Sequence, residues 1–376
     1  MTYGLNKTFL SLVLLVIGVF AVTGCRNETK TPAPPAGGKA ASSPVAGSAG
    51  SPAQAGTAAD SQSPTHGVVT DQFASTGKLV VLKVPVPPDP TSPEILLVGD
   101  ELNIFQEHGI LLDFIGVIPA PQNVASVVSG RIDVSPGSHI NRTIAGISAG
   151  AKILAVAGKT ETTERVPHMI GIVSKDSPVK APADLVGRKV GIPTIGGCNE
   201  YTPYAWLDKN GIADAKSKIE VIVMPEKNLE QVLRQGEIDL AMTHKLPEEI
   251  NRQGEFTVVF SDYDVWAGDG GATPFYFSTD YIKEHPDVVR AFVAAIAETL
   301  NWSNDHPYEA REITARRTNQ DVVNVSERYY TPNGIIKPET AIVWIDLLTA
   351  FGEIKPGLTA EQIYTNEFNP HYRPKL

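Results

Sequence analysis

The sequence has few cysteines and no excess of basic residues, and both shortages exclude classes of protein. Its 376 residues include 2 cysteines, which cannot form a disulfide framework or a four-cysteine zinc site. The 32 Lys and Arg are outnumbered by 42 Asp and Glu, for a formal net charge of -10. Because phosphate neutralisation needs a basic face, nucleic acid is not expected as a partner.

Signals of catalysis and of metal binding are also scarce. The sequence has no P-loop, and no Gly-x-Gly-x-x-Gly follows its first predicted strand. Its 8 histidines include no His-x-His or His-x₃-His pair, whereas zinc needs three or four ligands. We therefore expect no enzyme activity, no catalytic residue, no metal and no cofactor.

The N-terminal residues have the pattern of an export signal. Lys7 precedes an apolar run over residues 9–22, which at about 14 residues is shorter than the roughly 20 that span a membrane. The sequence Val-Thr-Gly-Cys at 22–25 resembles a bacterial lipobox, in which the cysteine is acylated. We predict a lipoprotein signal peptide over 1–24 and lipidation of Cys25; a signal peptide with a chance cysteine is the alternative.

A tether is predicted after the lipidated cysteine. Pro, Ala, Gly and Ser make up 27 of the 36 residues in 31–66, and this segment has no large apolar residue beyond Val45. Such a composition cannot bury enough surface to offset the entropy of ordering. We therefore expect residues 25–76 to hold the lipidated cysteine and a disordered tether, which places the folded body outside the cytoplasm, anchored to a bacterial membrane.

A strand–helix–strand–helix–strand order occurs twice in the folded body, about a hundred residues apart. The first copy is expected at 78–84, 92–108, 110–117, 123–129 and 132–134, and the second at 189–192, 199–210, 219–224, 229–235 and 238–240. Residues 130–135 (Gly-Arg-Ile-Asp-Val-Ser) match 236–241 (Gly-Glu-Ile-Asp-Leu-Ala). We expect both aspartates to satisfy backbone donors at a strand edge. Two copies of this unit indicate two similar α/β lobes.

The C-terminal part changes pattern. Strands are expected at 256–260 and 273–278, and helices at 287–301, from 307 and at 338–351. In the first of these helices, apolar residues 289, 292, 293, 296 and 300 recur at helical spacing. The simplest packing returns these helices to the first lobe. We therefore predict that 77–175 and 270–376 form lobe 1 and that 176–269 form lobe 2.

In order and spacing, several motifs together resemble those of the periplasmic solute-binding proteins of bacterial ABC importers, most closely the group that binds nitrate, taurine, aliphatic sulfonates and thiamine precursors. The motifs lie at 105–110 (Phe-Gln-Glu-His-Gly-Ile), 129–134, 173–178, 183–193, 236–239 and 301–307. The resemblance implies a type II-like two-lobe α/β fold, in which each lobe is a mixed sheet flanked by helices. It also implies a monomer that delivers a small molecule to an ABC permease.

Two other functions remain alternatives. A sensory or other non-transport lipoprotein could reuse the fold. The fungal thiamine-pyrimidine synthases also resemble these binding proteins, but they are cytosolic and carry a cysteine-rich iron motif that this sequence lacks. The loop at 194–199 (Thr-Ile-Gly-Gly-Cys-Asn) departs from the small-residue stretch common in oxyanion binders. A sulfonate, nitrate, a carboxylate and a heterocycle therefore stay open as ligands.

Candidate ligand contacts come from loops at the carboxyl ends of strands, where open α/β sheets bind ligands. The 194–199 loop opens a helix, whose free N–H groups attract anions. His139 and His244 follow the two repeated Ile-Asp strands. Each is either a ligand contact or an ordinary core histidine. Cys198 is either a buried small residue or part of the site. The predicted ligand-binding residues are Asp89, Ser138, His139, Thr194, Gly196, Gly197, Asn199, Thr243, His244 and Trp266.

Overall fold

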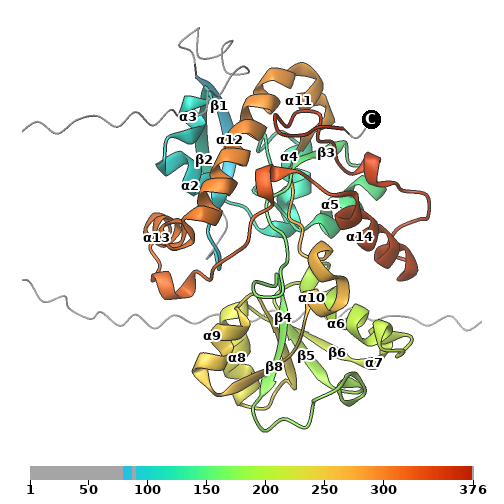
Figure 1. Cartoon of the computed structure of the whole chain (residues 1–376). Helices are drawn as coiled ribbons and strands as arrows, with labels where there is room; N and C mark the ends of the chain where they lie inside the picture. The colour runs from blue at the N-terminus through green and yellow to red at the C-terminus, as the bar shows by residue number, and fades with distance from the viewer. Residues whose placement is uncertain (1–78, 87–89, 375–376) are drawn as a thin grey trace, which may run out of the picture. The chain divides into compact units, whose positions relative to one another are not determined.

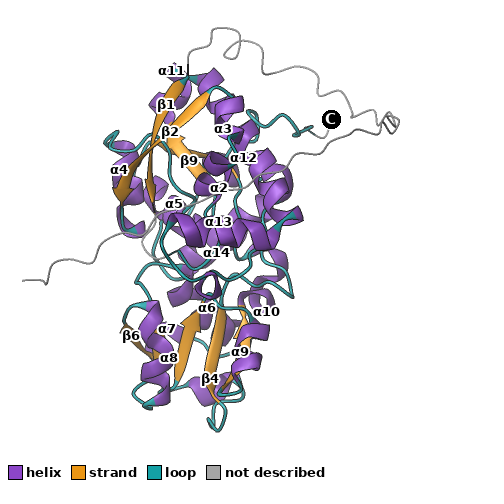
Figure 2. Cartoon of the chain, turned by 90° about the vertical axis from the view of Figure 1, so that its left-hand side faces the viewer, coloured by secondary structure: helices purple, strands orange, loops and turns teal. Residues whose placement is uncertain are grey.

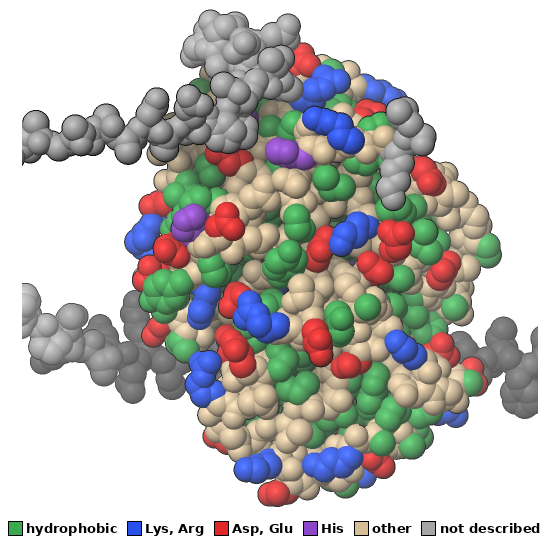
Figure 3. Space-filling view, in the orientation of Figure 1, with side chains coloured by type: hydrophobic (Ala, Val, Ile, Leu, Met, Phe, Trp, Pro, Cys, Tyr) green, Lys and Arg blue, Asp and Glu red, His purple; other side chains and the backbone are tan. Residues whose placement is uncertain are grey.

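The structure is a computed structural model, and it describes residues 79–86 and 90–374. The predicted signal peptide, Cys25 with its tether, and Asp89 lie outside the described residues. Within the described part of the chain, no helix combines the length and apolar character needed to cross a membrane. Acidic and basic side chains are interspersed over the face of the molecule seen in Figure 3.

Lobe 2 is built on a five-stranded mixed sheet, the lower sheet in Figure 1. Its strands, in spatial order, are β6 (Glu220–Val223), β5 (Lys189–Ile192), β7 (Leu240–Thr243), β4 (Ile170–Ser174) and β8 (Phe256–Ser261). Because β4 belongs to this sheet, the sheet begins before residue 176, where the predicted bounds start lobe 2. β5 runs parallel to β6 and β7, whereas β4 runs antiparallel to β7 and β8. The carboxyl ends of β5 and β7 therefore lie at the same edge of the sheet.

Helices cover both faces of this sheet. They are α6 (Cys198–Lys209), α7 (Ala215–Lys218), α8 (Glu226–Arg234), α9 (Pro247–Gln253) and α10 (Asp262–Trp266). Ile170 and Ile172 of β4 share a buried cluster with Leu229 of α8. The adjacent residue Val173 instead packs in the cluster that contains Leu207 of α6. Side chains that alternate along a strand thus bury against different helices, as the pleat requires.

Lobe 1 contains two separate strand pairs. The strands are β1 (Val80–Val86), β2 (Ile110–Val117), β3 (Ile153–Ala157) and β9 (Phe275–Ser278), with β1 parallel to β2 and β3 antiparallel to β9. The expected strand at 132–134 is wrong, because Val134 alone of these three residues forms a bridge, to Phe277. Pro136 follows closely and has no N–H with which to extend a ladder.

The helices of lobe 1 surround these strands (Figure 2). They are α2 (Ile95–Glu101), α3 (Ile104–Glu107), α4 (Asn123–Val128), α5 (Ile140–Ser148), α11 (Thr279–Glu284), α12 (Pro286–Asp305), α13 (Pro307–Arg317) and α14 (Pro338–Ala350). The single helix expected at 92–108 is two helices, since Asn103 adopts a left-handed φ of 61° that interrupts it. Asparagine tolerates that conformation better than most residues.

The long helix α12 supplies much of the core of lobe 1. Its predicted apolar face is confirmed, because all five side chains at that spacing are buried: Val289, Phe292, Val293, Ile296 and Leu300. Phe292 packs in one cluster with Phe105 and Phe275, which come from α3 and β9. Truncating such a buried aromatic side chain typically costs about 3–5 kcal/mol. Segments far apart in the sequence are thus held together by one apolar face.

The two repeated aspartates make the same contacts in the two lobes. Oδ2 of Asp133 accepts a hydrogen bond from the backbone N–H of Lys83 at 2.7 Å, and Oδ2 of Asp239 accepts one from that of Lys189 at 2.9 Å. The backbone N–H of each aspartate donates in turn to the carbonyl of the same lysine, at 2.9 and 2.8 Å. The expectation that these carboxylates satisfy backbone donors is confirmed.

We predict that Asp133→Ala and Asp239→Ala each lower the free energy of unfolding by about 1–3 kcal/mol, because each leaves a strand N–H without its acceptor. Urea denaturation measures this change. Asp346→Ala, at an exposed position of α14, is the matched control and should be close to neutral. Unchanged stability in both strand variants would show that the motif does not hold the strands.

Candidate functional site

The start of α5 in lobe 1 lies against the loop after β5 in lobe 2. Nδ2 of Asn141 donates to the carbonyl of Gly196 at 3.1 Å. Nη2 of Arg142 donates to Oγ1 of Thr194 at 2.9 Å and to the carbonyl of Ile195 at 3.2 Å. The loop predicted to bind ligand therefore faces the other lobe. Arg142, which the sequence did not single out, brings a guanidinium group to it.

His139 caps α5 and is buried between lobe 1 and a connecting segment. Its Nε2 lies 3.1 Å from the carbonyl oxygen of Gly270, and its ring meets the ring of Trp344 edge-on at 4.7 Å. Trp344 also contacts Trp266, with ring centroids 4.7 Å apart. Two of the predicted residues, His139 and Trp266, therefore contact the same buried tryptophan.

A cysteine and two further histidines lie beside His139. Sγ of Cys198 lies 3.4 Å from Nε2 of His168, whose ring is 5.2 Å from that of His139 and 5.1 Å from that of His244. Burial lowers the pKa of His168 to about 4. Burial alone would raise the pKa of Cys198, but His139 and His168 outweigh it and hold the thiol pKa well below its usual range.

His244 is oriented by a carboxylate. Its Nδ1 lies 2.8 Å from Oε2 of Glu226, the first residue of α8, and its backbone N–H donates to Oε1 at 2.7 Å. Thr243 donates to the same oxygen at 3.0 Å. Burial lowers the pKa of His244, but the Glu226 carboxylate outweighs it, and the pKa is raised. The two residues therefore form a charged pair.

Arg328 ties these segments together from lobe 1. Its buried guanidinium donates from Nη1 to the carbonyls of Pro167 and His168 at 2.9 and 3.3 Å, and from Nη2 to the carbonyl of His244 at 3.0 Å. One side chain thus satisfies backbone carbonyls in the segment before β4 and in the loop after β7. Both segments carry a histidine of the cluster.

The structure brings most of the predicted residues together, but with some differences in detail. Gly196 has a φ of 70°, in the left-handed region that favours glycine. A Cβ on Gly197 would lie 2.4 Å from Oδ1 of Asn199 and 2.9 Å from Nη2 of Arg142, so this loop is tightly packed. Asn199 lies in the first turn of α6, which begins at Cys198 with Gly197 as its cap. Ser138 accepts from Nδ2 of Asn123 at 2.8 Å.

Sequence reasoning did not find His168, Arg142 or Arg328. His168 and Arg328 lie in irregular segments, where periodicity gives no signal, and Arg142 lies within a helix that the pattern did not indicate. Residues 146–150 (Gly-Ile-Ser-Ala-Gly) do match a nucleophile-elbow sequence. However, Ser148 is the last residue of α5 and not part of a strand-to-helix turn, so the match lacks the structure that the motif requires.

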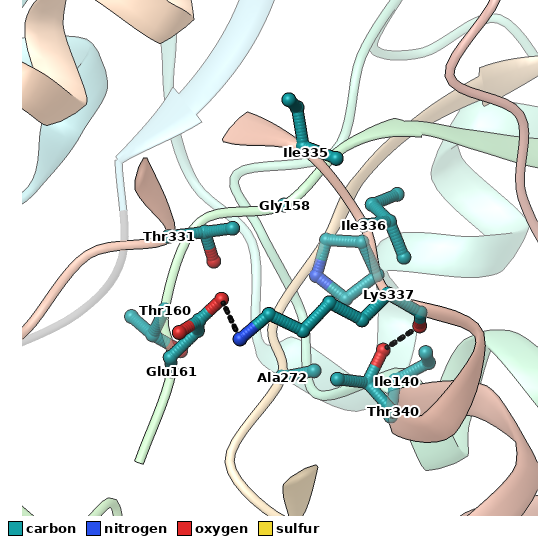
Figure 4. Close-up of a pocket in the computed structure, with 11 residues that line it drawn as sticks. Ile140, Gly158, Thr160, Glu161, Ala272, Thr331, Ile335, Ile336, Lys337 and Thr340 are labelled. Atoms are coloured by element: carbon teal, nitrogen blue, oxygen red, sulfur yellow. Dashed lines mark hydrogen bonds and ion pairs between the residues drawn. The ribbon is translucent and has the colours of Figure 1, made fainter. Parts of the chain in front are cut away.

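A separate small pocket in lobe 1 adjoins the start of α5 (Figure 4). The side chain of Lys337 extends across it to an ion pair with Glu161, at 3.0 Å. Thr340 donates to the carbonyl of Lys337 at 2.7 Å and anchors the other end of the lysine. Because the ion pair spans this pocket, the polar cluster around Cys198 is the stronger candidate site.

We predict that Arg328→Ala lowers the free energy of unfolding by about 2–3 kcal/mol, because hydrogen bonds from a charged donor to three carbonyls are lost. Chemical denaturation measures the change, with Arg252→Ala on the exposed side of α9 as the control. If the two variants unfold alike, Arg328 does not hold these segments.

Comparisons with known proteins agree with this architecture. A binding protein of Brucella abortus strain 2308 is 21% identical over 294 residues, which cover 73% of this chain and 86% of the relative. The periplasmic aliphatic sulphonate binding protein SsuA from Escherichia coli superposes with a TM-score of 0.61 at 15% identity, covering 79% of this chain and 94% of that structure. The desulfurization enzyme DszB superposes with a TM-score of 0.56 at 15% identity, covering 77% and 97%.

These structural likenesses confirm the predicted two-lobe periplasmic-binding-protein fold. The family model described as NMT1/THI5 like matches residues 93–310, more than half of the sequence. The chain therefore belongs to the NMT1/THI5-like family.

Proposed function

We propose that this protein is a lipid-anchored, extracytoplasmic solute-binding protein that captures a small molecule between its two lobes and delivers it to the permease of an ABC importer. The observation that carries the proposal is the convergence of polar side chains from both lobes on one buried layer. Arg142 and His139 come from lobe 1, whereas Thr194 and His244 come from lobe 2. A molecule held there contacts both lobes and stabilises their closure.

The chemistry of this layer favours an anionic ligand. The guanidinium of Arg142 donates to Thr194 in the loop before α6, and the N-terminus of α6 offers a positive dipole to an anion. The backbone N–H of Gly196 in this loop donates to the Glu200 carboxylate at 2.6 Å, so a bound anion would have to compete with it. Trp266 and Trp344 add apolar rings to the layer, since Trp344 contacts both Trp266 and His139. An organic sulfonate or carboxylate fits this combination better than a neutral heterocycle. SsuA from Escherichia coli, which shares the fold, is named for binding aliphatic sulphonates.

The fold alone does not decide between binding and catalysis, since DszB shares it and is named an enzyme. The Brucella relative, which aligns over most of both chains, is named a binding protein. We therefore favour binding without catalysis. A sensory lipoprotein would bind ligand in the same way, and stimulation of a reconstituted permease–ATPase complex by this protein distinguishes import from sensing.

We predict that a saturating organic anion, chosen by thermal-shift screening of sulfonates and carboxylates, reduces the radius of gyration measured by small-angle scattering. Arg142→Gln should weaken that ligand about 10- to 100-fold, as expected for one charged hydrogen-bond donor. Arg252→Gln is the matched control, because it removes an exposed guanidinium on α9. A radius that stays constant at saturation would contradict closure around the ligand.

We also predict that Cys25→Ser releases the protein from the membrane, because acylation of Cys25 provides the anchor and two or more acyl chains are needed for stable attachment. Fractionation of cells and mass spectrometry of the mature N-terminus test this. Cys198→Ser is the control that should leave membrane attachment unchanged. Equal membrane retention of the Cys25→Ser variant and the parent would refute the lipid anchor.

A further inference from the structure

The cluster of His139, His168 and Cys198 has the composition and spacing of a metal site. One donor atom from each residue lies within 4.8 Å of the other two, and all three residues are buried. The Cys198 sulfur and the nearest His168 nitrogen are 3.4 Å apart. In a tetrahedral site with Zn–S of about 2.3 Å and Zn–N of about 2.0–2.1 Å, sulfur and nitrogen are roughly 3.5 Å apart. The observed edge therefore matches that of a coordination tetrahedron.

Among the residues that the structure describes, the His168 ring nitrogens have one hydrogen-bond contact, with Cys198. Its Nδ1 is buried and lacks a hydrogen-bond partner among the described residues, and its Nε2 meets only Cys198. Leaving a buried polar nitrogen unpaired costs about 1–3 kcal/mol. Nε2, which faces the Cys198 sulfur, is therefore the His168 nitrogen that is placed to bind a metal ion.

His139 is oriented as metal-bound histidines usually are. Its Nδ1 lies 3.0 Å from Oδ1 of Asn141 and 3.4 Å from the backbone nitrogen of Asn141, whose Nδ2 donates to the carbonyl of Gly196 and so fixes the direction of the amide. A proton on Nδ1 donates to Oδ1 and replaces the longer capping contact. A ligand histidine typically donates its second N–H to such an oxygen. Nε2 then becomes the donor atom. It would exchange its contact with the Gly270 carbonyl for a metal, and that carbonyl keeps a donor, Nε1 of Trp344, at 2.8 Å.

We propose that His139, His168 and Cys198 form a binding site for a late first-row divalent cation of the Zn²⁺ class, assembled when the lobes close. His139 comes from lobe 1, Cys198 from the start of α6 in lobe 2, and His168 from the segment that leads into β4. The assembly of the site rests on the proposed closure of the two lobes around a ligand.

Thiolate and imidazole donors select zinc, copper or nickel over calcium or magnesium, which prefer oxygen ligands. Three protein ligands leave one tetrahedral position for water or for a donor atom of the captured molecule. In the second case the metal would bridge an anionic group of the ligand to both lobes. The donor set of this cluster therefore indicates the class of ligand, namely a metal ion or the complex of a metal ion with an anion.

The test uses the full-length Cys25→Ser chain, in which Cys198 is the only thiol, after removal of metals with a chelator. Titration calorimetry with Zn²⁺ should show one site per chain. Co²⁺ should give a thiolate-to-metal charge-transfer band, a signature that no histidine or carboxylate site produces. Cys198→Ser should abolish the band. Cys198→Ser and His168→Asn should each weaken Zn²⁺ at least about 100-fold, since even second-shell changes cost 10- to 100-fold.

His371→Asn, at an exposed position near the C-terminus, is the control and should bind Zn²⁺ like the parent. Melting curves without metal show whether each variant folds. The Co²⁺ band of the parent tests the metal site even if a variant does not fold, because it is measured on the parent alone. Absence of the band, or equal Zn²⁺ affinity in parent and Cys198→Ser, overturns the metal site. Small-angle scattering with a sulfonate and without metal tests the proposed function separately from the metal site. If the lobes close around the sulfonate, the proposed function stands even when Zn²⁺ does not bind. If the lobes close around no anion, the result counts against the proposed function even when Zn²⁺ binds.

Discussion

Segments that lie where the lobes meet bury backbone carbonyls, and the rest of the site depends on how these carbonyls are satisfied. Arg328 supplies donors to the carbonyls of Pro167, His168 and His244, and the indole of Trp344 supplies one to Gly270. A buried carbonyl without a donor would cost about 1–3 kcal/mol. Two long side chains from lobe 1 therefore hold the backbone on which the histidines are carried.

This arrangement explains why polar side chains accumulate where the lobes meet. The carboxyl ends of β5 and β7 share an edge of the sheet in lobe 2, and the start of α5 faces that edge from lobe 1. Backbone groups in these loops have no partners in a helix or a strand. They therefore form hydrogen bonds either with a ligand or with groups of the facing loop. In this structure Arg142 and Asn141 bond directly to the 194–196 loop. A bound anion would compete for these same donors.

The sequence predicted those parts of the fold that rest on local pattern. The repeated Ile-Asp units indicated equivalent positions, and Asp133 and Asp239 do make equivalent hydrogen bonds. The apolar face of α12 was evident from its spacing. The break at Asn103 was not, because a single left-handed residue hardly changes a helical pattern over seventeen positions. The interrupted strand at 132–134 likewise depends on the neighbouring Pro136 and on a distant partner, Phe277.

The sequence predicted only those candidate site residues that lie in loops next to regular elements. A rule about strand ends found His139, Thr194 and His244, because each follows or precedes a regular element. His168 precedes β4 but follows an irregular stretch, and 29 residues separate it from His139 and 30 from Cys198, so no spacing motif connects the three.

Metal-site signatures in sequences depend on ligands that share one helix or one tight turn, where the backbone fixes their separation. Here three separate segments supply the cluster, and tertiary packing through Arg328 and Trp344 fixes the distances instead. A site built in this way depends on the relative position of the lobes as much as on its own residues. Any change that opens the lobes must therefore separate His139 from Cys198, which couples the chemistry of the cluster to the conformation of the whole body.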